Sequence, residues 1–220
     1  PAPLEHRLEV LGTLRFDGQP FSGRIRKGRE LLALLLEARL LGRGGVSQLD
    51  LIDRLYPELE EEKAVAALKQ LVYRLRSALG NTLILRSSAG YVLGPVASDA
   101  EEFLHGGDLG LWQGPFLPDL DEALAPDARE VLYQNLRARA AEGLQAHPEA
   151  SLRAARILLE ADPYDEAALA LALLAQQALG HRKGMHELYR HSRERFLEVG
   201  ERLPESEDAF LARHAPLTRI

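Results

Sequence analysis

Between Glu62 and Gly80, apolar residues recur at helical spacing and polar residues fill the opposite side. At about 100° per residue, the apolar positions share a single arc of roughly 120°. These positions are Val65, Leu68, Leu71, Val72, Leu75 and Leu79. The opposite arc, here called the basic face, consists of Lys63, Ala66, Lys69, Gln70, Tyr73, Arg74, Arg76 and Ser77. The pattern predicts an amphipathic helix with one long cationic surface.

Two short runs typical of strands follow this helix directly, at Thr82–Arg86 and Gly90–Leu93. Only the small residues Ser87, Ser88 and Ala89 separate them, which indicates a β-hairpin. Upstream, Ser47 and Asp50 fit a capping box that opens a short helix, Gln48–Leu55. A short helix, a turn and a basic helix form a helix-turn-helix. With the hairpin after it, the unit is typical of a winged helix that binds DNA.

The chain before this unit predicts a small antiparallel sheet and a first helix. Arg7–Leu11 and Thr13–Phe16 alternate with a period near two, and Asp17–Gly18 is a hairpin-turn signal. Four cations then gather around the start of the first helix: Arg24, Arg26, Lys27 and Arg29. Two interpretations stay open for them. They are either the solvated start of a helix or a clamp on DNA phosphates, which fixes register without reading bases.

The second half of the chain is helical almost throughout. Pro and Gly breaks divide it into Asp127–Gln145, Glu149–Glu160, Asp165–Leu179, Arg182–Val199 and Glu205–His214. Small residues recur where close helix packing needs them, at Ala154, Ala155, Ala168, Ala172 and Ala175. We expect tetratricopeptide-like helix pairs, with a plain helical bundle as the alternative. Trp112 and Phe116, in the Gly/Pro-rich stretch before these helices, are expected to pack on them.

The predicted fold is therefore mainly α. An N-terminal winged helix, with a small antiparallel β-sheet and a β-hairpin wing, precedes an α-helical tetratricopeptide-like domain. A Pro/Gly segment after the hairpin marks the expected boundary, giving domains 1–97 and 98–220.

Composition and charge narrow the function classes. The chain lacks cysteine, which excludes disulfides, Fe–S clusters and thiolate zinc sites. No apolar run approaches the roughly 20 residues that span a bilayer, and the first residues lack the apolar core of a signal peptide. We expect a soluble cytoplasmic protein without membrane contact. The missing initiator Met leaves open that the chain is a fragment of a longer regulator.

The formal net charge of −6 argues at first against nucleic acid, but the charge is unevenly distributed. Residues 1–98 carry a net of +3 and residues 99–220 a net of −9. Such asymmetry indicates separate tasks for the two halves. For DNA binding, what matters is whether the basic residues share a face, as they do in the 62–80 helix.

Catalytic and metal-binding patterns are missing from the sequence. His186 and His191 resemble the pair of a zinc-protease helix, but they lie five residues apart, about 140° around the helix. No Ser-centred elbow of the G-x-S-x-G kind is present, and no pair of carboxylates stands out as acid and base. We expect no enzymatic activity, no cofactor and no metal.

Motifs along most of the chain, in order and in spacing, carry a family resemblance. They are ELLALLL (Glu30–Leu36), LIDRLYP (Leu51–Pro57), RLRSALG (Arg74–Gly80), GYVL (Gly90–Leu93), GPFLPD (Gly114–Asp119), LLEADPYDEAAL (Leu158–Leu169) and ALGHR…LYRHSRE (Ala178–Glu194). The helix and hairpin resemble the DNA-binding domain of OmpR/PhoB-type regulators. The whole resembles the version joined to a bacterial transcriptional activator domain, as in the antibiotic regulatory protein family.

This resemblance implies a transcriptional activator that binds repeated promoter sites and contacts RNA polymerase. Two positions depart from the family pattern. Tyr56 stands where a Trp is usual, and the wing tip is Ser87-Ser88-Ala89 instead of a basic or Pro-rich turn. Arg86 is therefore the only cation of the wing.

We expect the 62–80 helix to lie in the major groove, which is about 12 Å wide. The candidates for base contacts are Ala66, Lys69, Gln70 and Tyr73. The candidates for phosphate contacts are Arg24, Arg26, Lys27, Arg29, Arg74, Arg76, Ser77 and Arg86. A homodimer or tandem binding on direct repeats fits this interpretation. The competing hypothesis is a tetratricopeptide-like interaction adaptor with no DNA binding of its own.

Overall fold

The computed structural model describes residues 6–21 and 26–214. The chain divides into two compact units. The first comprises Pro1–Gly106 and Phe116–Val131, and the second comprises Gly107–Pro115 and Leu132–Ile220.

The first unit opens with the small sheet that the alternating pattern predicts. Strands β1 (Arg7–Glu9), β2 (Arg15–Phe16) and β3 (Gln19–Pro20) pair antiparallel in sequence order. The turn between β2 and β3 falls at Asp17 and Gly18, whose φ angles of 50° and 75° are typical of a tight hairpin. A fourth strand that the sequence pattern did not predict, β6 (Ala97–Ser98), pairs in parallel with β1.

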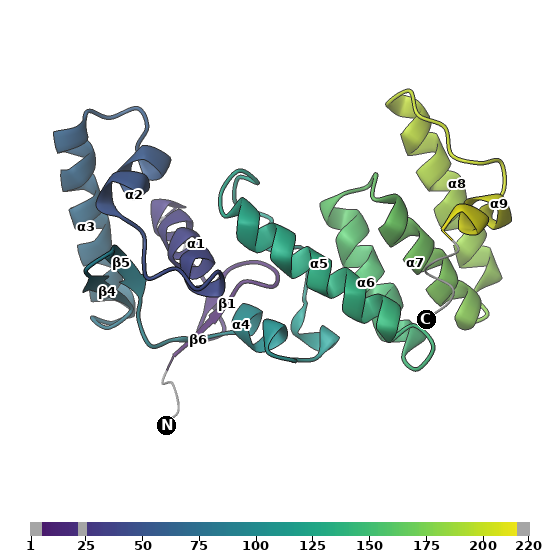
Figure 1. Cartoon of the computed structure of the whole chain (residues 1–220), viewed down its shortest axis with the longest axis horizontal. Coiled ribbons are helices and arrows are strands. Elements are labelled where there is room, and N and C mark those ends of the chain that lie inside the picture. The colour runs from purple at the N-terminus through teal and green to yellow at the C-terminus, as the bar shows by residue number, and fades with distance from the viewer. Residues whose placement is uncertain (1–5, 22–25, 215–220) are drawn as a thin grey trace. The chain divides into compact units, whose positions relative to one another are not determined.

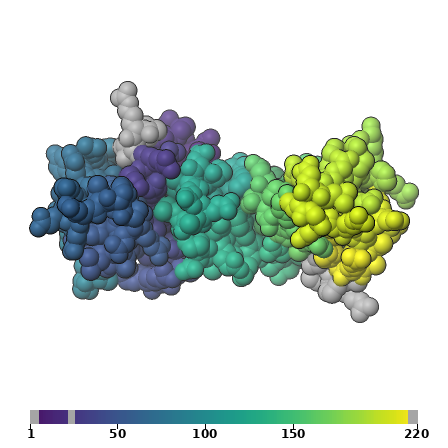
Figure 2. Space-filling view, turned by 90° about the horizontal axis from the view of Figure 1, so that it is seen from above, coloured from purple at the N-terminus to yellow at the C-terminus, as the bar shows by residue number. Residues whose placement is uncertain are grey.

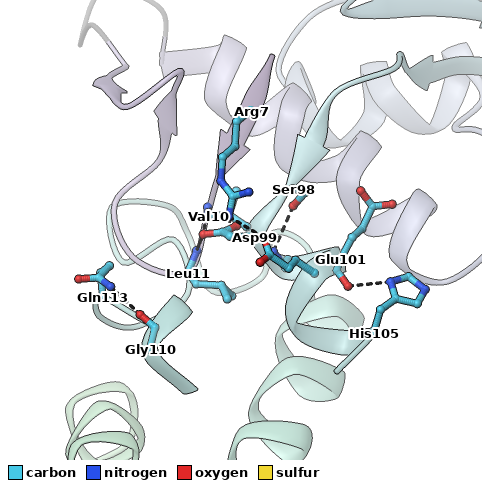
Figure 3. Close-up of polar contacts among 11 residues, drawn as sticks. Arg7, Val10, Leu11, Ser98, Asp99, Glu101, His105, Gly110 and Gln113 are labelled. Carbon is cyan, nitrogen blue, oxygen red and sulfur yellow. Dashed lines mark hydrogen bonds and ion pairs between the residues drawn. The ribbon is translucent and has the colours of Figure 1, made fainter. Parts of the chain in front are cut away.

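Asp99 holds the segment after β6 against this sheet. It is the first residue of α4 (Asp99–Leu104), and only 5% of its surface is exposed. Figure 3 shows its carboxylate directed at the backbone amides of Val10 and Leu11, which donate to it at 2.9 and 3.0 Å. The boundary expected between residues 97 and 98 thus lies inside a compact unit. A two-residue parallel strand and one buried carboxylate extend that unit beyond the Pro/Gly segment.

The helix-turn-helix lies in the same unit. It comprises α2 (Gln48–Leu55) and α3 (Glu61–Leu79), and both helices pack against α1 (Arg26–Leu40) (Figure 1). Helix α2 has the predicted bounds, and the Ser47 side chain caps it by accepting from the Asp50 amide at 3.0 Å. The interior is almost purely aliphatic, with Leu31, Leu35, Leu51, Leu55, Leu68 and Leu75 fully buried.

The predicted apolar arc of α3 needs correction at both ends. Leu68, Leu71, Val72 and Leu75 are buried as expected, but Val65 and Leu79 are only half-buried, and Ala64 is buried in place of Val65. Helical periodicity gives only the direction in which each side chain points. Burial near the start of a helix also depends on which elements pack there. Here the small Ala64 side chain turns inward, so the buried stripe begins one residue earlier.

The wing consists of β4 (Ile84–Ser87) and β5 (Gly90–Leu93), which pair antiparallel around a two-residue turn. The predicted first strand began at Thr82, two residues too early. The wing is joined to the segment before α2, because Val46 and Tyr91 exchange two backbone hydrogen bonds of 2.9 Å. Glycine is required at position 90, where φ is +129° and an added Cβ would lie 2.1 Å from the Val46 carbonyl oxygen.

The second unit is helical, as predicted. It contains the last part of α5 (Pro126–Glu142), then α6 (Pro148–Ala161), α7 (Glu166–Ala178), α8 (Arg182–Glu198) and α9 (Glu207–Arg213). Helices α6 and α7 pack against each other, and the predicted small residues on them are all buried: Ala154, Ala155, Ala168, Ala172 and Ala175. In the space-filling view, the last helices, coloured green to yellow, pack closely against one another (Figure 2).

Aromatic side chains complete this unit. Trp112 is buried and stacks on Tyr133 of α5, with ring centroids 5.6 Å apart, so its predicted packing is confirmed. Near the end of the chain, Tyr189, Phe196 and Phe210 join Leu169 and Leu173 in one cluster. The Tyr189 hydroxyl also donates to the Pro204 carbonyl at 2.8 Å, which holds the segment leading to α9.

Candidate nucleic-acid interface

The basic face of α3 is open to solvent over most of its length. Ala66, Lys69, Gln70 and Tyr73, the four candidates for base contacts, are all exposed. Tyr73 has 71% of its surface exposed, which is unusual for a large aromatic side chain. One side of the helix therefore presents a methyl, an ammonium, an amide and a phenol together. These are groups that can meet the edges of bases in a major groove.

Two of the phosphate candidates on α3, Arg74 and Ser77, are likewise exposed, but Arg76 is half-buried. Its Nε donates to the carbonyl oxygen of Ile84 in the wing at 2.8 Å. Arg76 thus ties the recognition-helix candidate to the hairpin. A guanidinium carries five N–H donors, so the remaining ones stay available for an anion.

The cations at the start of α1 are drawn toward an acidic residue. Arg26 Nε and Lys27 Nζ lie 3.4 and 3.0 Å from the carboxylate of Glu30, whose surface is 9% exposed. Lys27 also lies 5.6 Å from the centroid of the Tyr56 ring. These pairs reduce the positive charge that Arg26 and Lys27 can offer to DNA. Of the other two candidates here, Arg29 is half-buried, and Arg24 lies outside the described residues.

Tyr56, which stands where the family pattern has Trp, is half-buried beside the same carboxylate. Burial raises the pKa of its phenol, and the negative charge of Glu30 raises it further. Tyr56 is therefore neutral at physiological pH and packs as an aromatic side chain with one polar atom.

Arg86, the cation of the wing, is held by Tyr91. Its Nη2 donates to the Tyr91 hydroxyl at 2.7 Å, and the guanidinium carbon lies 4.4 Å from the centroid of that ring. The same nitrogen lies 3.5 Å from Oε1 of Gln48, the first residue of α2. The contact brings the wing to the amino end of α2.

The turn between α2 and α3 is acidic and exposed, as the sequence indicates. Glu58, Glu60, Glu61 and Glu62 all face solvent, and Glu60 pairs with Lys63 at 3.1 Å. Carboxylates stabilise the positive end of the α3 dipole. They also repel phosphate, so we expect the DNA-binding surface to end at this turn.

Sequence reasoning missed Gln48 and the buried Tyr91 as the side chains that contact Arg86. Tyr91 belongs to the GYVL motif, but the motif does not say which residue its hydroxyl meets. Gln48 lies 38 positions from Arg86, and no local signal connects them. Only the docking of the wing against α2 brings the three side chains together.

The described residues lack both a metal-binding cluster and a membrane-spanning helix. Across residues 6–21 and 26–214, no group of three or more His, Cys, Asp or Glu side chains could hold a metal ion. His186 pairs with Glu207 at 2.6 Å, and the Nδ1 of His191 contacts its own helix backbone. Within the same described part of the chain, no helix has the length and apolar character needed to cross a membrane.

Comparison with known proteins finds similarity among solved structures but none in sequence. No protein-family model and no curated protein matches the sequence. Among solved structures, the chain is similar to Mycobacterium tuberculosis EmbR in complex with a low-affinity phosphopeptide, with a TM-score of 0.59 and 20% identity. The match covers 97% of this chain and 65% of that one, so the chain spans less than two thirds of the neighbour's length. The likeness confirms the predicted fold class.

Proposed function

We propose that the chain is a DNA-binding transcriptional regulator that reads promoter DNA with α3 in the major groove. The observation that carries this proposal is the exposed basic face of α3, backed by a buried aliphatic stripe and flanked by the wing. A helix with this cross-section fits a groove about 12 Å wide. The net charge of +3 on residues 1–98 supports the same role.

Within that surface, contacts divide by chemistry. Lys69 suits the O6 and N7 acceptors of guanine, and Gln70 suits the N6 and N7 of adenine. Ala66 fits against a thymine methyl, and Tyr73, with 71% of its surface exposed, offers a phenol for a further base contact. Arg74, Ser77 and Arg86 supply phosphate contacts, which fix the position of the protein but carry no sequence information. Arg76 combines such a contact with its bond to the wing.

The helical second unit has the regulatory or partner-binding task in this proposal. RNA polymerase is the partner that the family resemblance implies, and activation of transcription is the implied outcome. That the EmbR neighbour was solved with a phosphopeptide is consistent with partner binding in a protein of this fold. Repeated promoter sites would be bound by a homodimer or by copies in tandem, in the cytoplasm.

The alternative is a tetratricopeptide-like adaptor whose winged helix only supports the structure. Its favouring observations are the net charge of −9 on residues 99–220 and the acidic turn before α3. The two functions differ in how binding responds to salt. Phosphate contacts release counterions, so specific DNA binding weakens steeply as salt rises.

The test begins with selection of bound duplexes from a random DNA pool by the intact chain. Affinity for the selected duplex is then measured across salt for wild type, Lys69→Ala and Arg74→Ala. Lys183→Ala is the matched control, because this lysine has 90% of its side chain exposed and lies on α8 of the other unit. A base contact at Lys69 should contribute roughly 1–3 kcal/mol and confer preference at one position, whereas loss of Arg74 should weaken all sequences alike.

Failure would be equally clear. If no duplex is enriched, or if Lys69→Ala and Arg74→Ala bind like Lys183→Ala, the chain does not read DNA through α3. Enrichment of a protein partner by the same intact chain would then favour the adaptor.

A further inference from the structure

The wing carries its single cation in a constrained position. Arg86 and Tyr91 are directly opposed in the hairpin register, and Arg86 donates to the Tyr91 hydroxyl at 2.7 Å. The guanidinium also lies over the Tyr91 ring, 4.4 Å from its centroid. A hydrogen bond and a cation–π contact to one side chain limit the rotamers open to the arginine.

Burial and backbone hydrogen bonds fix the position of Tyr91. Only 2% of its surface is exposed, and its backbone is bonded to Val46 on both the N–H and the carbonyl side. The phenol therefore has a fixed place between the wing and the chain before α2. Because the support is fixed, the guanidinium that rests on it is fixed as well.

The direction of Arg86 follows from its second contact. Its Nη2 lies 3.5 Å from Oε1 of Gln48, so the side chain runs toward the first residue of α2. An arginine that probes a minor groove from a wing must extend past the wing tip. This one would have to leave both Tyr91 and Gln48 to do so.

Among residues 6–21 and 26–214, nothing occupies most of the donors of Arg86, which leaves them for an anion. Of five N–H groups, one is used in the bond to Tyr91, and the contact with Gln48 is at the limit of a hydrogen bond. A guanidinium held as a rigid fork suits the bidentate geometry of a phosphate and loses little freedom on binding.

We propose that Tyr91 is a positioning residue that fixes Arg86 as a phosphate contact on the first strand of the wing, beside α2. The wing accordingly contributes affinity, and α3 contributes sequence preference. This inference rests on the proposed DNA-binding function and adds to it the role of a residue that would not itself touch a base.

A double-mutant cycle on the full-length chain tests the inference. Affinity for the selected duplex is measured across salt for wild type, Tyr91→Phe, Arg86→Gln and the double variant. Tyr91→Phe keeps the ring and removes only the hydroxyl. It should weaken binding roughly 3- to 10-fold in the presence of Arg86 and less than about 2-fold in the Arg86→Gln background.

The salt dependence separates positioning from general damage. Arg86→Gln should reduce the slope of log K against log salt by about 0.9, the value for one phosphate contact, and should weaken every duplex alike. Arg86→Lys keeps the charge but not the fork-shaped set of donors, so its affinity for the duplex should lie between those of wild type and Arg86→Gln. The thermal unfolding midpoint of Tyr91→Phe is recorded beside these titrations to detect any loss of fold.

Two results would overturn the inference while leaving the proposed function intact. One is an equal loss from Tyr91→Phe with and without Arg86. The other is a changed preference between A·T and G·C pairs in Arg86→Gln, which would mean that the wing reads a minor groove. Absence of DNA binding by the wild-type chain would overturn both the function and the inference that depends on it.

Discussion

The carboxyl group of Asp99 should make the stability of the protein depend on pH in an unusual direction. It is 5% exposed and accepts hydrogen bonds from the Val10 and Leu11 amides. Burial raises its pKa from 3.8 to about 6, against the opposing effects of those hydrogen bonds and of the nearby Arg7 charge. Asp99→Asn, which removes the titration and keeps one acceptor oxygen, is the perturbation.

The sign and the size follow from the two pKa values. Between about pH 4 and pH 7, the folded state holds more protons at Asp99 than the unfolded state does, because the folded pKa is the higher one. Lowering the pH through this window therefore favours the folded state. A shift of about 2 units corresponds to about 3 kcal/mol in total, with a steepest slope of about 1.4 kcal/mol per pH unit.

The assay is denaturant unfolding at several pH values from about 7.5 to about 4, for wild type and Asp99→Asn. Other titrating groups are common to both proteins, so the difference in free energy of unfolding isolates Asp99. Wild type should gain stability relative to the variant as pH falls. Glu102→Gln is the matched control, since this carboxylate on the same helix is half-exposed and pairs with Arg7 at 2.8 Å. Its difference from wild type should stay small at every pH.

A pH-independent difference between wild type and Asp99→Asn would refute this reasoning. So would the opposite sign, with wild type losing stability relative to the variant as pH falls. That result would mean that the backbone hydrogen bonds stabilise the ionised carboxylate more than burial destabilises it.

Three further substitutions test the packing described above by denaturant unfolding. Gly90→Ala should destabilise by about 2 kcal/mol or more, because its Cβ would strike the Val46 carbonyl at a φ of +129°; Gly44→Ala, with its nearest neighbour 4.0 Å away, should be tolerated. Ser47→Ala should lower the free energy of unfolding by about 1 kcal/mol, because α2 loses its cap. An unchanged free energy of unfolding would show that the cap does not stabilise the protein. Leu173→Ala should lower the free energy of unfolding by about 2–5 kcal/mol, since this side chain is fully buried. A loss below about 1 kcal/mol would contradict the close packing of the cluster around Leu173.

Local periodicity was sufficient to predict the helices and the hairpin. The bounds of α2 were predicted to the residue, and those of α8 to within one. Such elements depend on spacing, caps and turn residues close together in sequence, all of which are visible in one chain. The exposure of Lys69, Gln70 and Tyr73 follows from the same periodicity, because a helix with one buried stripe must present the other side.

Long-range pairings were not predictable in this way. Strand β6 has only two residues and exists because β1, about 90 positions earlier, offers it a free edge. Asp99 reads locally as the start of a helix, yet its carboxylate is used by Val10 and Leu11. Neither pairing produces a periodic pattern in the sequence. The boundary expected after residue 97 therefore fell inside a compact unit.

The sequence by itself determined which side of α3 is basic, the bounds of α2, and that small residues on α6 and α7 would be buried. Tertiary structure decided which of the basic side chains remain free. Arg26 and Lys27 are drawn to Glu30, Arg76 is bonded to the wing, and Arg86 is held by Tyr91. The physical reason is that an arc on a helix depends on spacing alone. The partner of a long charged side chain depends instead on every element that folds within its reach.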